Sequence, residues 1–222
     1  RRFSQQKNSI INGNSSYTAK RIEEVYGIKC GFIHPCVDRE EYTDNTHQFS
    51  NPYIQAKEGE YVVTIGTANW AKGSMETISM LSGTNISLVH VGGGNNDQIQ
   101  TLHKHASNKN VKLWVAPRLS SPQLSILMKE SLAIVSMAHK EPFGLTPIEA
   151  FSIGTPAIFV DDGGFRDSII DGECGRLLPR YDYGKWHEAL NQCKDAKIRE
   201  KWAIAGRNRI LQLKLSPLEQ AR

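Results

Sequence analysis

Two glutamates in one short segment are the residues of this chain best suited to chemistry on a polar ligand. Glu141 precedes the turn Pro142 to Gly144, and Glu149 follows inside a pattern typical of a helix. Carboxylates accept hydrogen bonds from hydroxyl groups, while the start of a helix offers unpaired N–H groups and a positive dipole end to an anion. The segment therefore predicts an anion site flanked by two carboxylates that bind hydroxyl groups.

Each part of this segment also has an ordinary interpretation, with Glu141 complementing the helix dipole and Glu149 as a solvated helix residue. Their combination is more specific than either part. A strand at Leu132 to Ser136 leads into Glu-Pro-Phe-Gly, then a helix at Leu145 to Ile153, then Gly154-Thr155-Pro156 and another strand. We therefore interpret the segment as the candidate functional site.

A glycine turn with a single lysine forms a second candidate. Gly66 and Thr67 follow the apolar run Tyr61 to Ile65, and Lys72 stands at the head of the next predicted helix. A lysine in that place can neutralise a phosphate. From this loop alone, an exposed lysine on a surface turn is the alternative.

The loop Gly92 to Gly94 invites comparison with the dinucleotide fingerprint G-x-G-x-x-G, but the sixth position is Asp97. No acidic residue ends a following strand at the expected distance, so a dehydrogenase is disfavoured. We interpret the glycines as a tight turn that lets the backbone approach a ligand or the neighbouring loop, with turn geometry alone as the alternative.

Short aliphatic runs alternate with helical patterns from Tyr61 onward, which is typical of βα units and a parallel sheet. The predicted fold class is α/β, a doubly wound parallel sheet that binds ligands beyond the carboxyl ends of its strands. The expected strands are Tyr61 to Ile65, Ile86 to Val91, Val111 to Val115, Leu132 to Ser136 and Pro156 to Val160. The expected helices are Ser74 to Leu81, Asp97 to Ser107, Pro122 to Glu130, Leu145 to Ile153, Lys185 to Cys193 and Ile198 to Leu213.

The first 60 residues follow a different pattern, typical of a connector. The pair Ser15-Ser16 could supply the cap that begins a helix, and Gly27 is of the type that ends one. The expected elements are a strand at Ser9 to Asn12, a helix at Ser16 to Tyr26, a strand at Lys29 to Ile33 and a polar loop at Asp38 to Glu60. Because the chain opens on Arg1 without Met and reaches a strand at once, we expect it to start inside a longer protein.

Composition excludes several classes of protein. The 222 residues are 39% hydrophobic and 23% charged, with a net charge of +4, an ordinary globular balance. Basic residues form no run and do not alternate with aromatic ones, so a small anionic ligand is favoured over nucleic acid. No apolar stretch approaches the roughly 20 residues of a membrane-spanning helix. Four cysteines without a C-x-x-C pair predict reduced thiols in a cytosolic protein and no zinc site.

The segment Glu141 to Glu149 resembles the E-x7-E signature of the group 1 family of retaining glycosyltransferases, which have two Rossmann-like domains in the GT-B arrangement. Further resemblance lies in Asn14 to Thr18, Tyr26 to Gly27, Ile33 to Asp38, Ile65 to Gly73, Val160 to Asp167 and Gly172 to Leu178, so it covers nearly the whole chain. It implies an interdomain connector and the start of the C-terminal domain at residues 1–60. It also implies a nucleotide-sugar-binding Rossmann-like domain at residues 61–222, with the N-terminal acceptor domain absent.

The resemblance implies a role for each matching position. Glu141, the catalytic position, would lie near the donor sugar hydroxyls, and Glu149 would accept hydrogen bonds from the ribose. Lys72, in one loop with Gly66 and Thr67, would neutralise the diphosphate. The remaining donor-binding positions are the backbone N–H groups of Phe143, Gly144, Leu145 and Thr146 around the sugar and phosphates, and Arg118 and Leu119 beside the base.

The chemistry so implied needs no metal ion and no cofactor, because N–H groups and a lysine can stabilise the charge on the leaving phosphate. Glu141 would position the donor rather than form a covalent bond. In this family the acceptor is usually explained as attacking from the same face of the sugar from which the nucleotide departs.

Two features depart from the family pattern. The family commonly has an arginine directly after the loop glycine, where this chain has Thr67, and Arg118 is one cation that could compensate. A frequently cited family histidine belongs to the absent domain, and we interpret His34 and His139 as loop or packing residues. We expect the fragment to bind donor and scarcely turn over.

The predicted function is a hexosyltransferase domain that binds a nucleotide diphosphate sugar, with mannose or glucose as the guess, for transfer to a glycan or lipid-linked acceptor. The alternatives are a nucleotide-sugar epimerase or phosphorylase of the same architecture, and a non-catalytic nucleotide-binding module. In such a module Thr67 would reflect the loss of catalytic function. Glu141 and Glu149 argue against the module. A lipid-linked acceptor would place a cytoplasmic enzyme at the inner membrane face, although no basic stripe supports this.

Overall fold

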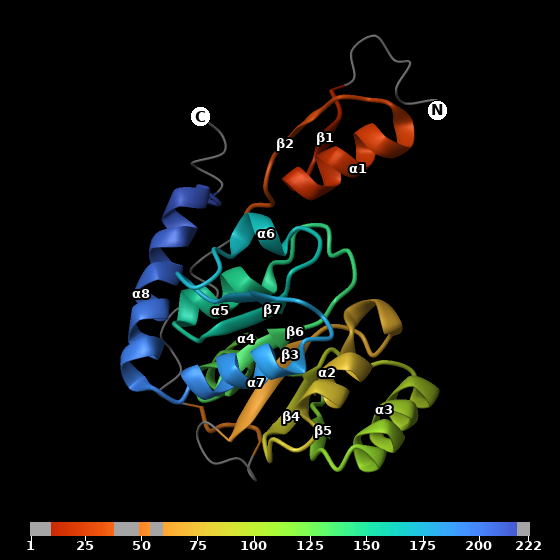
Figure 1. The fold of residues 1–222 in the computed structure, drawn as a ribbon, viewed down its shortest axis with the longest axis vertical. Helices are drawn as coiled ribbons and strands as arrows, with labels where there is room; N and C mark the ends of the chain where they lie inside the picture. The colour runs from red at the N-terminus through yellow and green to blue at the C-terminus, as the bar shows by residue number, and fades with distance from the viewer. Residues whose placement is uncertain (1–9, 38–48, 54–59, 217–222) are drawn as a thin grey trace.

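The computed structural model describes residues 10–37, 49–53 and 60–216, and it contains a large and a small parallel sheet (Figure 1). The large sheet has the strand order β5-β4-β3-β6-β7-β8. Its strands are β3 (Tyr61–Ile65), β4 (Ser87–Val91), β5 (Leu113–Val115), β6 (Ala133–Ser136), β7 (Ala157–Val160) and β8 (Arg176–Leu178). The order runs outward from β3 in one direction and from β6 in the other, which is the doubly wound pattern. The predicted fold class is confirmed.

Helices cover both faces of this sheet. On one face α2 (Ser74–Leu81) contacts α3 (Asn96–Asn108) and α7 (Tyr183–Gln192). On the other, α5 (Thr146–Ile153) contacts α4 (Ser121–Lys129) and α8 (Ala196–Leu213). Right-handed crossovers require this division, because the strand order reverses between β3 and β6. No helix in the described part of the chain is long and apolar enough to cross a bilayer.

The central strands are buried on both faces, which explains why they are continuous apolar runs in the sequence. Every residue of β6 and β7 is buried. Ile148 and Phe151 of α5 pack into the same core, at 0% and 1% exposure. The strand ends that carry the candidate residues are therefore fixed by a well-packed interior.

The predicted elements between β3 and α8 all have observed counterparts whose ends differ by at most two residues. Three short elements were not predicted. They are η4 (Trp70–Lys72), a 3-10 helix, α6 (Phe165–Ser168) and β8 (Arg176–Leu178). Three or four residues are too few to show a helical or strand period.

A small unit precedes the large sheet (Figure 1). In it β1 (Asn12–Gly13) pairs in parallel with β2 (Gly31–Phe32) beside α1 (Ser16–Tyr26). Ser15 caps α1 and Gly27, with a φ of 68°, ends it, as predicted. Both strands are shorter than expected; Ser9 and most of the predicted loop at 38–60 lie outside the described residues.

Candidate functional site

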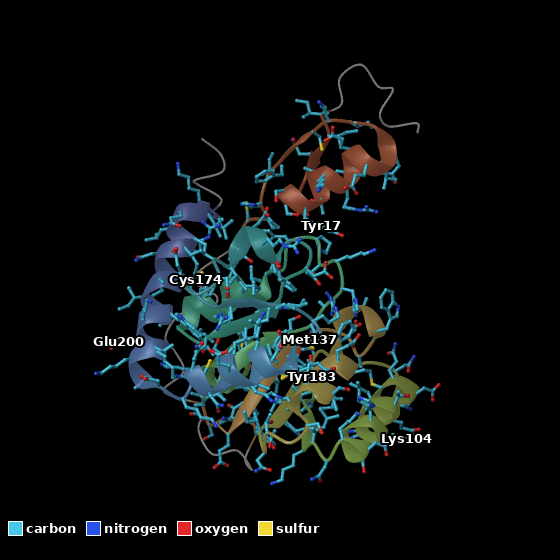
Figure 2. The ribbon with its side chains drawn as sticks, viewed as in Figure 1. Tyr17, Lys104, Met137, Cys174, Tyr183 and Glu200 are labelled. Atoms are coloured by element: carbon cyan, nitrogen blue, oxygen red, sulfur yellow. The ribbon has the colours of Figure 1, made fainter. Side chains whose placement is uncertain are left out.

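The loops after β3 and β6 meet at the point where the strand order reverses. The two strands are neighbours, with Val62 opposite Ala133, yet the helices that follow them cover opposite faces of the sheet. A reversal of this kind, beyond the carboxyl ends of the strands, is where open α/β sheets bind ligands. Met137, in the loop after β6, lies in this central region (Figure 2).

Lys72 and Glu141 come together at this place. Nζ of Lys72 lies 2.7 Å from Oε2 of Glu141, and their side chains are 35% and 20% exposed. This exposure leaves both groups accessible to a ligand, and an ion pair screened by water is weak enough to rearrange. Two residues that the sequence singled out in separate loops thus form one site.

A close approach of two backbones sets this pairing. Gly73 follows Lys72 with a φ of 67°, and a Cβ on it would lie 2.0 Å from the carbonyl oxygen of Met137. Nearby, the N–H of His139 donates to the carbonyl of Ala71 over 2.7 Å. Only glycine permits both the conformation and the contact. The loop after β3 is thereby fixed on the loop after β6.

The start of α5 belongs to the same loop. The helix begins at Thr146, and Leu145 at its N-cap provides no side-chain hydrogen bond to the first turn. An uncapped start leaves backbone N–H groups available to an anion. Glu149 lies in the first turn of α5. Gly144, just before the helix, has a φ of 82°.

The segment after β7 packs on the backbone of Glu141. A Cβ on Gly163 would lie 2.5 Å from the carbonyl oxygen of Glu141, and the N–H of Gly164 donates to that oxygen over 2.7 Å. The glycine pair therefore fits the Glu141 loop closely and holds it in place.

Arg180 fixes the same region, and it was not predicted. Its side chain is 10% exposed and donates to the carbonyls of Met137 and Ala138 and, over 2.8 Å, to the carboxylate of Asp162. Asp162 in turn accepts a bond from the N–H of Lys140. In the sequence Arg180 resembles any surface arginine, because the short strand that brings it to the site has no periodic signal.

His34 and Phe143 join the small N-terminal unit to the site loop. The centroids of their rings lie 4.9 Å apart, and Nε2 of His34 is 3.1 Å from Oδ2 of Asp167. Phe143 is 2% exposed and anchors the turn after Glu141. The hydroxyl of Ser16 also donates to Asp167. These contacts agree with the interpretation of His34 as a packing residue.

His139 has a comparable structural role. Its Nε2 lies 2.8 Å from Oε1 of Glu76, and the centroid of its ring lies 5.4 Å from that of Trp70.

The glycine turn after β4 approaches the neighbouring loop, one of the two alternatives left open by the sequence. The N–H of Gly66 donates to Val91 over 2.8 Å, and the N–H of Ala68 donates to Gly93 over 2.7 Å. Thr67, between them, is exposed, and its hydroxyl oxygen accepts a bond from Asn69. The loop that carries Gly66, Thr67 and Lys72 is therefore supported from the side of β4 as well as β6.

Arg118 and Leu119 lie between β5 and α4, beyond the edge strand of the sheet. Arg118 is exposed, whereas Leu119 packs against the core. The structure does not bring Arg118 into the Lys72–Glu141 pair.

Residues 46–209 match the family model described as Glycosyl transferases group 1. The chain belongs to this family. It is 26% identical over 202 residues to the D-inositol 3-phosphate glycosyltransferase of Rhodococcus erythropolis, an alignment that covers 84% of this chain and 46% of that protein. The chain thus spans less than half of this relative.

Solved structures show the same fold. A glycosyltransferase from Rickettsia africae matches with a TM-score of 0.81 at 16% identity, over 96% of this chain and 60% of that one. The Anabaena protein HepE, in complex with UDP and glucose, matches with a TM-score of 0.75 at 16% identity, over 92% and 60%. This group 1 chain is therefore the C-terminal Rossmann-like domain of a GT-B architecture.

Proposed function

We propose that this chain binds a nucleotide diphosphate sugar and provides the donor half of a retaining hexosyl transfer. The observation that carries the proposal is the convergence of Lys72, Glu141 and the uncapped start of α5 where the strand order reverses. A cation, a dipole end and a carboxylate match the diphosphate and the sugar hydroxyls of such a donor.

The diphosphate lies between Nζ of Lys72 and the backbone N–H groups from Phe143 to Thr146, with Gly66 and Thr67 beside it. On donor binding Lys72 turns from Glu141 to the diphosphate, and the released carboxylate accepts hydrogen bonds from the sugar. The bond from the anomeric carbon to the phosphate oxygen breaks and its electron pair stays on that oxygen, where the N–H groups and Lys72 stabilise the growing charge. The acceptor hydroxyl forms the new bond to the anomeric carbon from the same face and gives its proton to the leaving phosphate. These groups stabilise the leaving phosphate, a role that a metal ion or cofactor has in other enzymes.

Glu149, in the first turn of α5, accepts hydrogen bonds from the ribose, and the base extends toward Arg118 and Leu119. The transferred sugar is mannose or glucose, and the acceptor is a glycan or a lipid-linked saccharide at the cytoplasmic face of a membrane. An N-terminal domain of the whole protein supplies the acceptor side. The complex of HepE with UDP and glucose supports the donor class.

Calorimetric titration with GDP, UDP, ADP, GDP-mannose and UDP-glucose tests the proposal. We expect selective binding of one base, and a loss of about 1–3 kcal/mol in binding free energy for Lys72→Ala and Glu149→Ala. Lys104→Ala is the matched control, because this lysine is exposed on α3 (Figure 2). If none of the five ligands binds at millimolar concentration, or if saturable binding is found only for NADH, the proposal is wrong.

A further inference from the structure

A hollow lies beside the loop that carries Lys72. It has a volume of about 360 Å³, at the low end for ligand pockets, and lies between η4 and the start of α3. Ala68, Asn69, Trp70, Asn95, Asp97 and Gln98 are among the residues that line it. Its lining includes neither member of the Lys72–Glu141 pair and no residue of α5. Because α3 and α5 cover opposite faces of the sheet, this hollow is distinct from the proposed donor site.

Trp70 presents a large aromatic face at this hollow. Trp70 is 75% exposed, so its ring adds little to the core and leaves apolar surface in water. The ring is nevertheless oriented, since it lies 5.4 Å from the ring of His139, which is bound to Glu76. Asn69 also caps η4 through the N–H of Lys72. An exposed indole ring whose orientation is fixed in this way can stack on the C–H face of a pyranose ring.

The opposite wall carries hydrogen-bonding groups whose direction is set by the backbone. Asn95 and Gln98 form a capping box at the start of α3, in which each side-chain oxygen accepts a backbone N–H, at 2.9 and 3.0 Å. With both oxygens used, the two NH₂ groups remain as donors. Asp97, exposed between them, adds carboxylate oxygens as acceptors. Adjacent donors and acceptors are what neighbouring sugar hydroxyls require.

We propose that this hollow binds a saccharide unit of the acceptor, with Trp70 beneath the sugar ring and Asn95, Asp97 and Gln98 on its hydroxyls. The assignment to the acceptor rests on the proposed function, whereas binding of the saccharide does not require the nucleotide. A nucleobase would also stack on Trp70, but the proposed donor places its nucleoside beside Glu149 on the opposite face of the sheet.

Titration of the 222-residue chain with maltotriose and with linear α-mannotriose, followed by tryptophan fluorescence and saturation-transfer NMR, tests this inference. We expect one trisaccharide to bind and shift the emission to the blue. Trp70→Ala should weaken that binding at least about tenfold, while Trp70→Phe should retain most of it. Asp97→Asn should also weaken it. Tyr26→Ala, which removes an exposed aromatic ring from α1, should have no effect.

Binding of UDP and GDP is measured on the same variants. Nucleotide binding without any trisaccharide binding overturns this inference and leaves the proposed function intact. Trisaccharide binding through Trp70 without nucleotide binding supports the hollow as a saccharide site and contradicts the proposed function. Trisaccharide binding that is unchanged in both Trp70→Ala and Asp97→Asn, or displacement of the sugar by a nucleoside, also overturns the inference.

Discussion

The ammonium of Lys72 lies 2.7 Å from the carboxylate of Glu141, although the two residues follow different strands of the sheet. A diphosphate that binds Lys72 must compete with this carboxylate. Under the proposed function, Glu141 would oppose the binding of a bare nucleotide and favour a donor whose sugar hydroxyls it can bind. Comparing the affinity for a nucleoside diphosphate with that for the corresponding nucleotide sugar distinguishes the competition for Lys72 from the contact with the sugar.

Glu141→Gln should raise the affinity for a nucleoside diphosphate and lower the affinity for the corresponding nucleotide sugar. The gain is at most about fivefold, since a partly exposed ion pair is worth about 0–1 kcal/mol. The loss for the nucleotide sugar is about 1–3 kcal/mol for a charge-assisted hydrogen bond. Calorimetry with both ligands measures the changes, and Glu173→Gln, an exposed glutamate in a turn, is the control. Equal changes for the two ligands would show that Glu141 does not contact the sugar.

Thr67→Arg should strengthen nucleotide binding, because it restores the cation that the family commonly has after the loop glycine. Thr67 is exposed, and its hydroxyl accepts a bond from Asn69, so the longer side chain has room. We expect a gain of about 3- to 10-fold, larger at low salt. Asn108→Arg adds the same charge at the distant end of α3. An equal gain in both variants would mean that net charge alone is responsible.

Gly163→Ala should disrupt the site, whereas Gly83→Ala should only strain the backbone. Both glycines have a positive φ, 61° and 80°, but a Cβ on Gly163 meets the backbone of Glu141, and one on Gly83 meets nothing within 4 Å. Each variant loses about 1 kcal/mol of folding stability from the left-handed conformation. Nucleotide-sugar affinity should fall only in Gly163→Ala. If the two variants bind equally well, the segment after β7 does not position Glu141.

Arg180→Ala should lower the free energy of unfolding by about 2–4 kcal/mol, because it leaves Asp162 and two carbonyls without their buried donor. Arg166→Ala is the matched control, since its pair with Asp161 is 55% and 45% exposed and should contribute no more than about 1 kcal/mol. Urea unfolding measures both. A similar small loss in the two variants would contradict the role of Arg180.

His90 should make the fold less stable in acid. Its side chain is fully buried in β4, and burial lowers its pKa below the ordinary value. The unfolded chain therefore binds a proton near pH 6.5 that the folded chain does not bind. Stability falls as the pH drops through that value toward the lowered pKa. His90→Asn should reduce the slope of unfolding free energy between pH 7 and 5, and an unchanged slope would show that other groups cause it.

Periodicity was sufficient to predict the alternation of strands and helices. Apolar runs and terminal glycines are local signals, and β3 and α2 have the predicted ends. The resemblance also pointed to Lys72 and Glu141, but their contact depends on the strand order, which no local pattern contains. Arg180 was missed for the same reason, because a strand of three residues brings it to the site.

The hollow beside Trp70 illustrates the same limit. Its two walls come from η4 and the start of α3. The capping box of Asn95 and Gln98 is a local motif, and Trp70 is a single residue in a loop. The pairing of β3 with β4, the bond from the N–H of Ala68 to the carbonyl of Gly93 and the packing of α2 on α3 bring the walls together, and none of these is a local signal.

The most direct test of the donor site is to map amide chemical shifts while the chain is titrated with the nucleoside diphosphate that it binds best. If the start of α5 holds the diphosphate, the largest shifts will be those of Gly144, Leu145 and Thr146, and Lys72→Ala will reduce them. If the largest shifts instead lie at Gly92 to Gly94 and the start of α3, the diphosphate binds in the loop after β4. That result would contradict the proposed donor site.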